Sequence, residues 1–219
     1  MTIHLTFLCA PGGDAALDPL LGDGPLGERG QRMAGMARAV LSPHEMAVRA
    51  PSVRCSQTAD AMGLTAVPEP ALRDLDLGTW RGRTLDDVAA SDPDGFSAWL
   101  TDPDAAPHDG ESVRQLCRRT AEWLRSMPAD AGHAVAVTEA AVVRAALIHA
   151  LAVPARAFRH LGVRPLSAVA LTRQYGYWEV RLGYVLPQGA GRRLLSRPAA
   201  PVPTCGDQPA PAQLRDVAA

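Results

Sequence analysis

The stretch AVAVTEAAVVRAALIHAL, residues 134–151, decides the fold class of this chain. Its first four residues form an uninterrupted apolar run, which is typical of a strand buried on both faces of a sheet. From Glu139 onward the apolar residues recur at helical spacing, so the stretch predicts a helix over 139–151. A buried strand that leads directly into such a helix is typical of α/β proteins with a parallel sheet.

The same alternation of strand and helix continues on both sides of this stretch. Apolar, β-rich runs predict further strands at 3–10, 46–52 and 166–185, the last being two neighbouring strands. Helical spacing predicts helices at 26–41, 54–64 and 111–127. This order predicts a three-layer α/β/α sandwich around a mostly parallel central sheet. In such a sheet a ligand binds beyond the carboxyl ends of the strands, which are here residues 10–14, 52–54 and 138–139.

The chain length and its last segment predict the domain organisation. A chain of 219 residues fits one domain of generous size, and we expect that domain to cover residues 1–186. From Pro187 the sequence is rich in Pro, Ala and Arg and has no apolar periodicity. Residues 187–219 are therefore predicted to form a flexible tail.

Composition excludes several classes of function. The 22 basic residues are all arginines and are balanced by 23 acidic residues, so no basic surface for nucleic acid or an anionic membrane is expected. The absence of lysine excludes Schiff-base and P-loop lysine mechanisms. The four cysteines show no paired spacing, and we expect no metal, no cofactor and reduced thiols in the cytoplasm. The expected partner is a small-molecule substrate or ligand, and a homodimer is left open.

Six segments, in order along residues 3–186, carry a family resemblance. They are FLCAPGGDA (7–15), LGERGQRMA (26–34), SVRCSQTA (52–59), LRDLDLGTWRG (72–82), HDGES (108–112) and VAVTEAAVVRAAL (135–147). Together they resemble the histidine phosphatase (phosphoglycerate mutase-like) superfamily. The resemblance implies a phosphate pocket built from an Arg-His pair at the first strand end, an Arg before the second helix, an acid, and a His at the third strand end.

This chain departs from that pattern at most of these positions. Carried over one by one, the Arg-His pair becomes Ala10 and Pro11, and the last histidine becomes Glu139. The second arginine is kept as Arg54, and the acid is Asp74. Proline has neither a nucleophile nor an N–H donor, so no phosphohistidine can form at position 11. The chain is thus predicted to be a degenerate member that lacks both catalytic histidines.

Three carboxylates are the candidate catalytic groups: Glu139, Asp74 and Glu111. Arg54 is the one certain cation among them and the candidate anion-binding residue. Glu139 also has a structural interpretation, because it opens a helix where its charge would meet the helix dipole. Glu111 likewise could serve as a first-turn helix residue. Carboxylates in such excess should bind a phosphate dianion poorly.

Three more residues are candidates for substrate contact. Asp14 follows a glycine pair and is either a turn residue or a pocket residue. His108 lies in a Pro- and Asp-rich loop, where most histidines are exposed and have no role in binding. Trp80 occupies the family's Gly-x-Trp position and is expected to pack with one edge near the site.

These residues leave three functions open. The first is a non-phosphatase enzyme whose carboxylates perform acid/base chemistry on a small organic substrate, such as a secondary metabolite: isomerisation, dehydration, cyclisation or hydrolysis. The second is a catalytically dead pseudophosphatase that binds a ligand or partner. The third, least favoured by the charges, is a residual phosphatase that uses water directly. Acids kept at both catalytic edges favour the enzyme.

Overall fold

A central six-stranded sheet organises the protein. The computed structural model describes residues 2–12, 21–38, 41 and 43–184. The strands are β1 (Ile3–Cys9), β2 (Met46–Arg49), β3 (Val67–Pro68), β4 (His133–Thr138), β5 (Ser167–Gln174) and β6 (Tyr177–Tyr184). Their order across the sheet is β3-β2-β4-β1-β5-β6. The first four are parallel, whereas β5 runs antiparallel to both β1 and β6.

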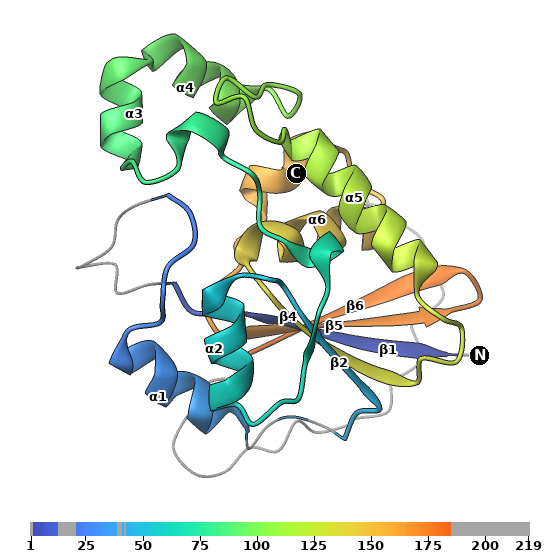
Figure 1. Cartoon of the computed structure of the whole chain (residues 1–219). Coiled ribbons are helices and arrows are strands. Elements are labelled where there is room, and N and C mark those ends of the chain that lie inside the picture. Colours follow the sequence, from blue (N-terminus) through green and yellow to red (C-terminus); the bar gives the residue numbers. More distant parts are fainter. Residues whose placement is uncertain (1, 13–20, 39–40, 42, 185–219) are drawn as a thin grey trace, which may run out of the picture. The chain divides into compact units, whose positions relative to one another are not determined.

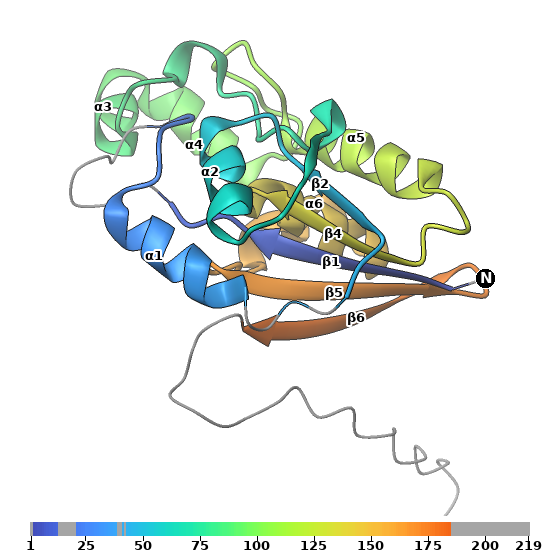
Figure 2. The same ribbon diagram turned by 60° about the horizontal axis from the view of Figure 1, so that its bottom comes forward.

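Helices connect the parallel strands. They are α1 (Glu28–Ala37), α2 (Val53–Ala61), α3 (Leu85–Ser91), α4 (Pro93–Thr101), α5 (Val113–Ser126) and α6 (Ala140–Ala150), with the 3-10 turns η2 (Pro70–Leu72), η3 (Gly78–Trp80) and η4 (Ala155–His160). The helices α1, α2, α5 and α6 cover the two faces of the sheet, whereas α3 and α4 pack on each other away from it (Figure 1). The chain moves from β1 to β3 through α1 and α2 and returns to β4 through α5. Since such crossovers are right-handed, the return places α5 and α6 on the face opposite α1 and α2. Figures 1 and 2 show this arrangement.

The observed elements confirm the predicted α/β fold with a mixed, mostly parallel sheet. The predicted strand at 46–52 is shorter than expected, because Ser52 already caps α2 by accepting a hydrogen bond from the Cys55 amide (3.1 Å). The turn η4 was not predicted from the sequence. The predicted tail at 187–219 and the candidate residue Asp14 lie outside the described residues.

The core lies on both faces of the sheet, against α1 and α2 on one side and against α5 and α6 on the other. The α5 face predicted from apolar spacing is buried at Val113, Leu116, Trp123 and Leu124, and Trp123 meets the edge of the Phe7 ring of β1. Among the described helices, none is long and apolar enough to cross a membrane. In a mostly parallel sheet such as this one, the carboxyl ends of the strands are the place where the polar side chains of a binding site gather.

Candidate functional site

The end of β4 and the segment after η2 are tied together, and this brings two predicted site residues to one place. The Thr138 hydroxyl, at the end of β4, donates to the Leu72 carbonyl at 2.8 Å. The Arg119 guanidinium of α5 donates to the carbonyls of Ala71 (2.7 Å) and Arg73 (2.9 Å). Asp74 is thus held beside Glu139, which follows Thr138 directly.

Glu139 is a buried carboxylate without a cationic partner among the described residues. It occupies the N-cap position of α6, yet its side chain accepts no hydrogen bond from the helix amides. Instead the carboxylate accepts a hydrogen bond from the Ser52 hydroxyl at 2.5 Å and a longer one from Thr138 at 3.5 Å. Only 6% of Glu139 is exposed. The side chain of Glu139 thus binds the hydroxyls at the strand ends and caps no amide of α6, although its charge lies at the start of that helix, as the helix-dipole interpretation expects.

Asp74 is perturbed by the same environment. Burial, and then the nearby charge of Glu139, raise the pKa of the Asp74 carboxyl from 3.8 to about 7. The Leu75 amide donates to its carboxylate at 2.8 Å, and the charges of Arg54 and Arg119 act in the opposite, weaker direction. Two interacting carboxyl groups at a cleft, one of which has a pKa near 7, are the arrangement expected of a proton-transferring site.

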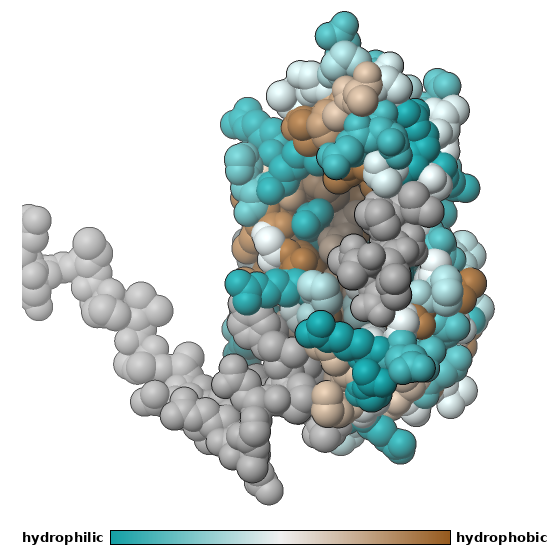
Figure 3. Space-filling model, turned by 90° about the vertical axis from the view of Figure 1, so that its left-hand side faces the viewer, coloured by the Kyte–Doolittle hydropathy of each residue, from teal (hydrophilic) through white to brown (hydrophobic). Residues whose placement is uncertain are grey.

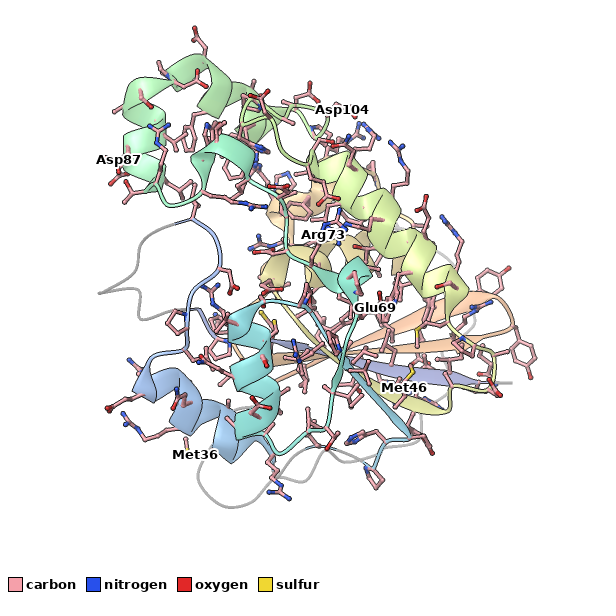
Figure 4. The ribbon with its side chains drawn as sticks, viewed as in Figure 1. Met36, Met46, Glu69, Arg73, Asp87 and Asp104 are labelled. Carbon is pink, nitrogen blue, oxygen red and sulfur yellow. The ribbon has the colours of Figure 1, made fainter. Side chains whose placement is uncertain are left out.

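A cavity of about 680 Å³ opens beside this pair. Figure 3 shows the surface hollowed on this side of the molecule, and Figure 4 labels Arg73, one of the residues that line the cavity. Besides Asp74, Glu139 and Ser52, its charged lining residues are Asp23, Arg73, Asp76 and Arg81. The cavity has the size of a site for a small organic ligand.

The structure corrects the expectation that Arg54 is the one certain cation of the site. Arg54 does not line the cavity. Arg73 and Arg81 do, and each is in an ion pair: Arg81 with Asp76 at 2.7 Å and Arg73 with Glu111 at 3.7 Å. Arg54 itself donates to the Gly22 carbonyl at 3.3 Å. Its buried Nε has no hydrogen-bond partner among the described residues. The positive charges are therefore present, but mostly engaged.

Glu111 is not brought together with Asp74 and Glu139. It does not line the cavity; instead Arg119 binds its carboxylate in a bidentate manner, at 2.9 and 2.6 Å. Because Arg119 also holds the carbonyls of the segment before Asp74, Glu111 acts on the site through Arg119. Among the described residues, Glu111 thus contacts Arg119 and Arg73 and lies outside the cavity lining.

Two glycines of the quoted motifs explain how the Trp80 and Glu111 segments meet. Gly78 has φ of 45°, and a Cβ there would lie 1.9 Å from the His108 carbonyl oxygen. A Cβ at Gly110 would lie 2.1 Å from the Asp76 carbonyl oxygen. Two backbone hydrogen bonds join the two segments at this close approach. The Thr79 amide donates to the His108 carbonyl and the Glu111 amide donates to the Asp76 carbonyl, each at 2.8 Å. Only glycine fits at either position.

His108 and Trp80 belong to a buried aromatic cluster and do not line the cavity. The interpretation of His108 as an exposed histidine is wrong, since its exposure is 0%. Its Nδ1 accepts a hydrogen bond from Gly110, and its ring meets the Trp80 ring edge-on, at 5.0 Å between centroids. Trp80 also contacts Phe96 and Trp99 of α4. Both residues thus pack the part of the chain that carries α3 and α4.

Sequence reasoning missed four charged residues and one hydroxyl of the cavity: Asp23, Ser52, Arg73, Asp76 and Arg81. Arg73, Asp76 and Arg81 lie inside the quoted 72–82 motif, close to Asp74 and Trp80. Their position in that motif could have identified them as candidate site residues. Asp23 accepts hydrogen bonds from the Val53 and Arg54 amides at the start of α2, at 2.8 and 3.4 Å. No local sequence pattern predicts that long-range contact.

The end of β1 carries buried apolar residues that lie outside the cavity lining. The Ala10 amide donates to the Thr138 carbonyl at 2.8 Å, which joins the ends of β1 and β4. Ala10 and Pro11 are both buried, and neither lines the cavity. Gly30 of α1 lies against the Pro11 ring. Below the site, burial and the charges of Glu139 and Asp74 raise the pKa of the Cys9 thiol to about 12, which leaves it protonated.

Comparison with known proteins gives the chain its family. Two curated relatives match over part of their length: an uncharacterised protein of Mycobacterium bovis (33% identity, 40% of this chain, 23% of the relative) and the Yersinia pestis protein named "Probable phosphoglycerate mutase GpmB" (29% identity, 64% of this chain, 66% of the relative). The crystal structure of the alpha-ribazole phosphatase from Shigella flexneri shares the fold, with a TM-score of 0.75 at 20% identity over 82% of this chain and 95% of that one. The profile of the histidine phosphatase superfamily (branch 1) matches residues 21–184, and the chain therefore belongs to that superfamily.

Proposed function

We propose that this chain is a non-phosphatase enzyme that uses the carboxyl groups of Asp74 and Glu139 for acid/base chemistry on a small organic molecule. The observation that carries the proposal is the pair of neighbouring carboxyl groups, in which burial and the charge of Glu139 raise the pKa of Asp74 to about 7. A group that titrates near the working pH is suited both to donate and to accept a proton. The reactions that fit are isomerisation, dehydration, cyclisation and hydrolysis.

The roles of the two acids follow from their surroundings. Asp74 holds a proton near neutral pH and is the proposed general acid. Glu139, held by the hydroxyls of Ser52 and Thr138, is the proposed general base. Among the described residues, neither carboxylate forms an ion pair with an arginine. Arg73 and Arg81 line the cavity wall, each in an ion pair with a carboxylate, and are the proposed residues that orient a polar group of the substrate.

The proposal includes the loss of both catalytic histidines of the family. It rests on the motif positions, where Pro11 and Glu139 stand in place of histidine and Ala10 in place of arginine. A buried proline ring at the end of β1 offers no atom that can carry a phosphoryl group. The chain is therefore proposed to have kept the superfamily's fold and cavity while its chemistry changed.

A second candidate function is a pseudophosphatase that binds a ligand without turning it over. The observation that favours it is the engagement of the cavity arginines by Asp76 and Glu111, which leaves the cavity formed but gives no direct sign of a reacting group. Under this alternative the carboxyl pair would only contact the ligand.

One experiment separates these functions from each other and from a residual phosphatase. Purified protein is incubated with a small-molecule extract of its source organism, and compound loss is followed by mass spectrometry. We expect one compound to be consumed, with the rate reduced about 10²–10⁴-fold in Glu139→Gln and in Asp74→Asn. The control is Glu122→Gln, which changes an exposed glutamate of α5.

The same samples are tested for phosphate release from an aryl phosphate and from a phosphoglycerate. We expect release no faster than that of an Arg54→Met variant. Rapid release that needs Arg54 would reject the non-phosphatase proposal. Near-normal consumption by both acid variants would reject the acid/base roles, and retention of a compound without consumption would favour the pseudophosphatase.

A further inference from the structure

The outer edge of β6 is open among the described residues. β6 is the last strand in the sheet order and pairs only with β5 in the described part of the chain. It is eight residues long, and it exposes two large side chains, Tyr177 (80% exposed) and Leu182 (74% exposed). An edge strand of this length presents unpaired amides and carbonyls to any strand that can align with it.

The side chains of β6 divide between its two faces. Trp178, Val180 and Leu182 lie opposite Arg173, Leu171 and Val169 of β5, and so share the face that carries α5 and α6. Glu179 and Arg181 lie on the other face, where both are exposed and joined by an ion pair of 2.9 Å. The strand therefore carries one negative and one positive charge, two residues apart, on one side.

Symmetry limits how two such edges could pair. In an antiparallel pair related by a two-fold axis normal to the sheet, directly opposite residues point to the same face. The axis must therefore pass beside a residue, and not between two residues. An axis at position 179 would set Glu179 against Glu179, and an axis at 181 would set Arg181 against Arg181. Like charges directly opposite each other are unfavourable.

An axis at Val180 gives complementary pairs at every neighbouring position. Glu179 then lies opposite Arg181 of the second copy, and Arg181 opposite its Glu179. On the other face Trp178 lies opposite Leu182 of the second copy, so the exposed Leu182 side chain gains an aromatic neighbour. The existing Glu179–Arg181 pairs of the two strands would join into four alternating charges.

We propose that β6 is a self-association surface, through which two copies of this chain pair antiparallel about Val180 into one continuous sheet. The proposal is independent of the proposed function, because β6 contributes no residue to the cavity. Pairing through a single strand edge buries less area than a standard protein interface, so the dimer is expected to be weak, with a micromolar dissociation constant.

Charge reversal tests the proposal on the full chain. Sedimentation velocity is measured over a concentration series for the native chain, Glu179→Arg, Arg181→Glu and the double variant. We expect the native chain and the double variant to dimerise, and each single variant to associate at least about tenfold more weakly. Mixing the two single variants should restore a dimer, because one strand then carries two arginines and faces two glutamates on the other strand.

A control and a fold check keep the result interpretable. Asp104→Arg reverses an exposed charge of the Asp104–Arg114 pair, away from β6, and should leave dimerisation unchanged. Thermal midpoints of all variants should agree, since exposed ion pairs contribute little to stability. A native chain that stays monomeric at several hundred micromolar would overturn the proposal, as would residues 185–219 covering the β6 edge. Single variants that dimerise as the native chain does would overturn it too.

Discussion

Replacing Asp74 by Asn should stabilise the protein at neutral pH, although Asp74 lies at the candidate site. The folded state holds a proton on Asp74 up to a pKa of about 7, whereas the unfolded chain releases it near 3.8. The folded state therefore binds more protons than the unfolded state between these values, and its free energy of unfolding falls as pH rises through this window. Asn carries no titrating proton and avoids that loss.

The pKa shift sets the magnitude. Between the ordinary pKa of 3.8 and the raised pKa of about 7, at about 1.4 kcal/mol for each pH unit, the gain is limited to about 4 kcal/mol above pH 7. Asp74 is only partly buried and relaxes with its neighbours, so we expect about 1–3 kcal/mol. The Asn side-chain oxygen can still accept from the Leu75 amide, so the local turn is kept. In a domain of this size the gain corresponds to a rise in Tm of about 3–10 °C.

The assay is the thermal midpoint from pH 4 to pH 8 for the native chain and Asp74→Asn. The difference between them should be near zero at pH 4, grow toward pH 7 and then level off. Asp104→Asn is the matched control, because the Arg114 ion pair lowers the pKa of Asp104 and its removal should give no gain. In a Glu139→Gln background the gain from Asp74→Asn should shrink, since part of the shift comes from the charge of Glu139. A difference that does not change with pH would refute the reasoning.

Three further predictions concern stability elsewhere in the chain. Glu111→Gln should cost about 3–5 kcal/mol of unfolding free energy, seen in urea titration, because Arg119 would keep a largely buried charge without its bidentate partner; a loss under 1 kcal/mol would contradict this. Burial and the adjacent His133 ring lower the pKa of His4, so stability should fall as pH drops below about 6.5, and His4→Gln should flatten that part of the Tm profile. Removing residues 187–219 should move Tm by no more than about 2 °C, and a drop of ten degrees would show that the segment packs on the core.

The strands and helices were largely predictable because their signals are local. Apolar runs and helical spacing placed β1, β4, α5 and α6 within one or two residues of their observed ends. The turn η4 has no apolar periodicity of its own, and its place depends on contacts with α5 and α6. The length of β2 depends on Ser52, whose capping bond and contact with Glu139 are visible only in the folded chain.

The family motifs located the site but could not say which glycines and rings serve it. Gly78 and Gly110 belong to two quoted motifs and are 32 residues apart in the sequence, and the structure shows that each is required by the backbone of the other segment. Trp80 and His108 lie on these two segments, and their rings contact each other in a buried aromatic cluster. A motif residue near a site can therefore be needed for the approach of two loops, with no contact to a ligand.

The separation of the acids shows why the chemistry itself could not be predicted from residue types. Glu111 and Glu139 are both glutamates beside the start of a helix, and the sequence offers the same structural alternative for each. In the folded chain Arg119 of α5 forms an ion pair with Glu111, which depends on the packing of α5. Arg81 forms an ion pair with Asp76, which depends on the local turn at 76–81. Among the described residues no arginine forms an ion pair with Asp74 or Glu139. Of these acids, Asp74 has the raised pKa, and burial together with the nearby charge of Glu139 is its cause. The distribution of arginines, more than the number of acids, therefore singles out Asp74 and Glu139 as the proposed proton-transfer pair.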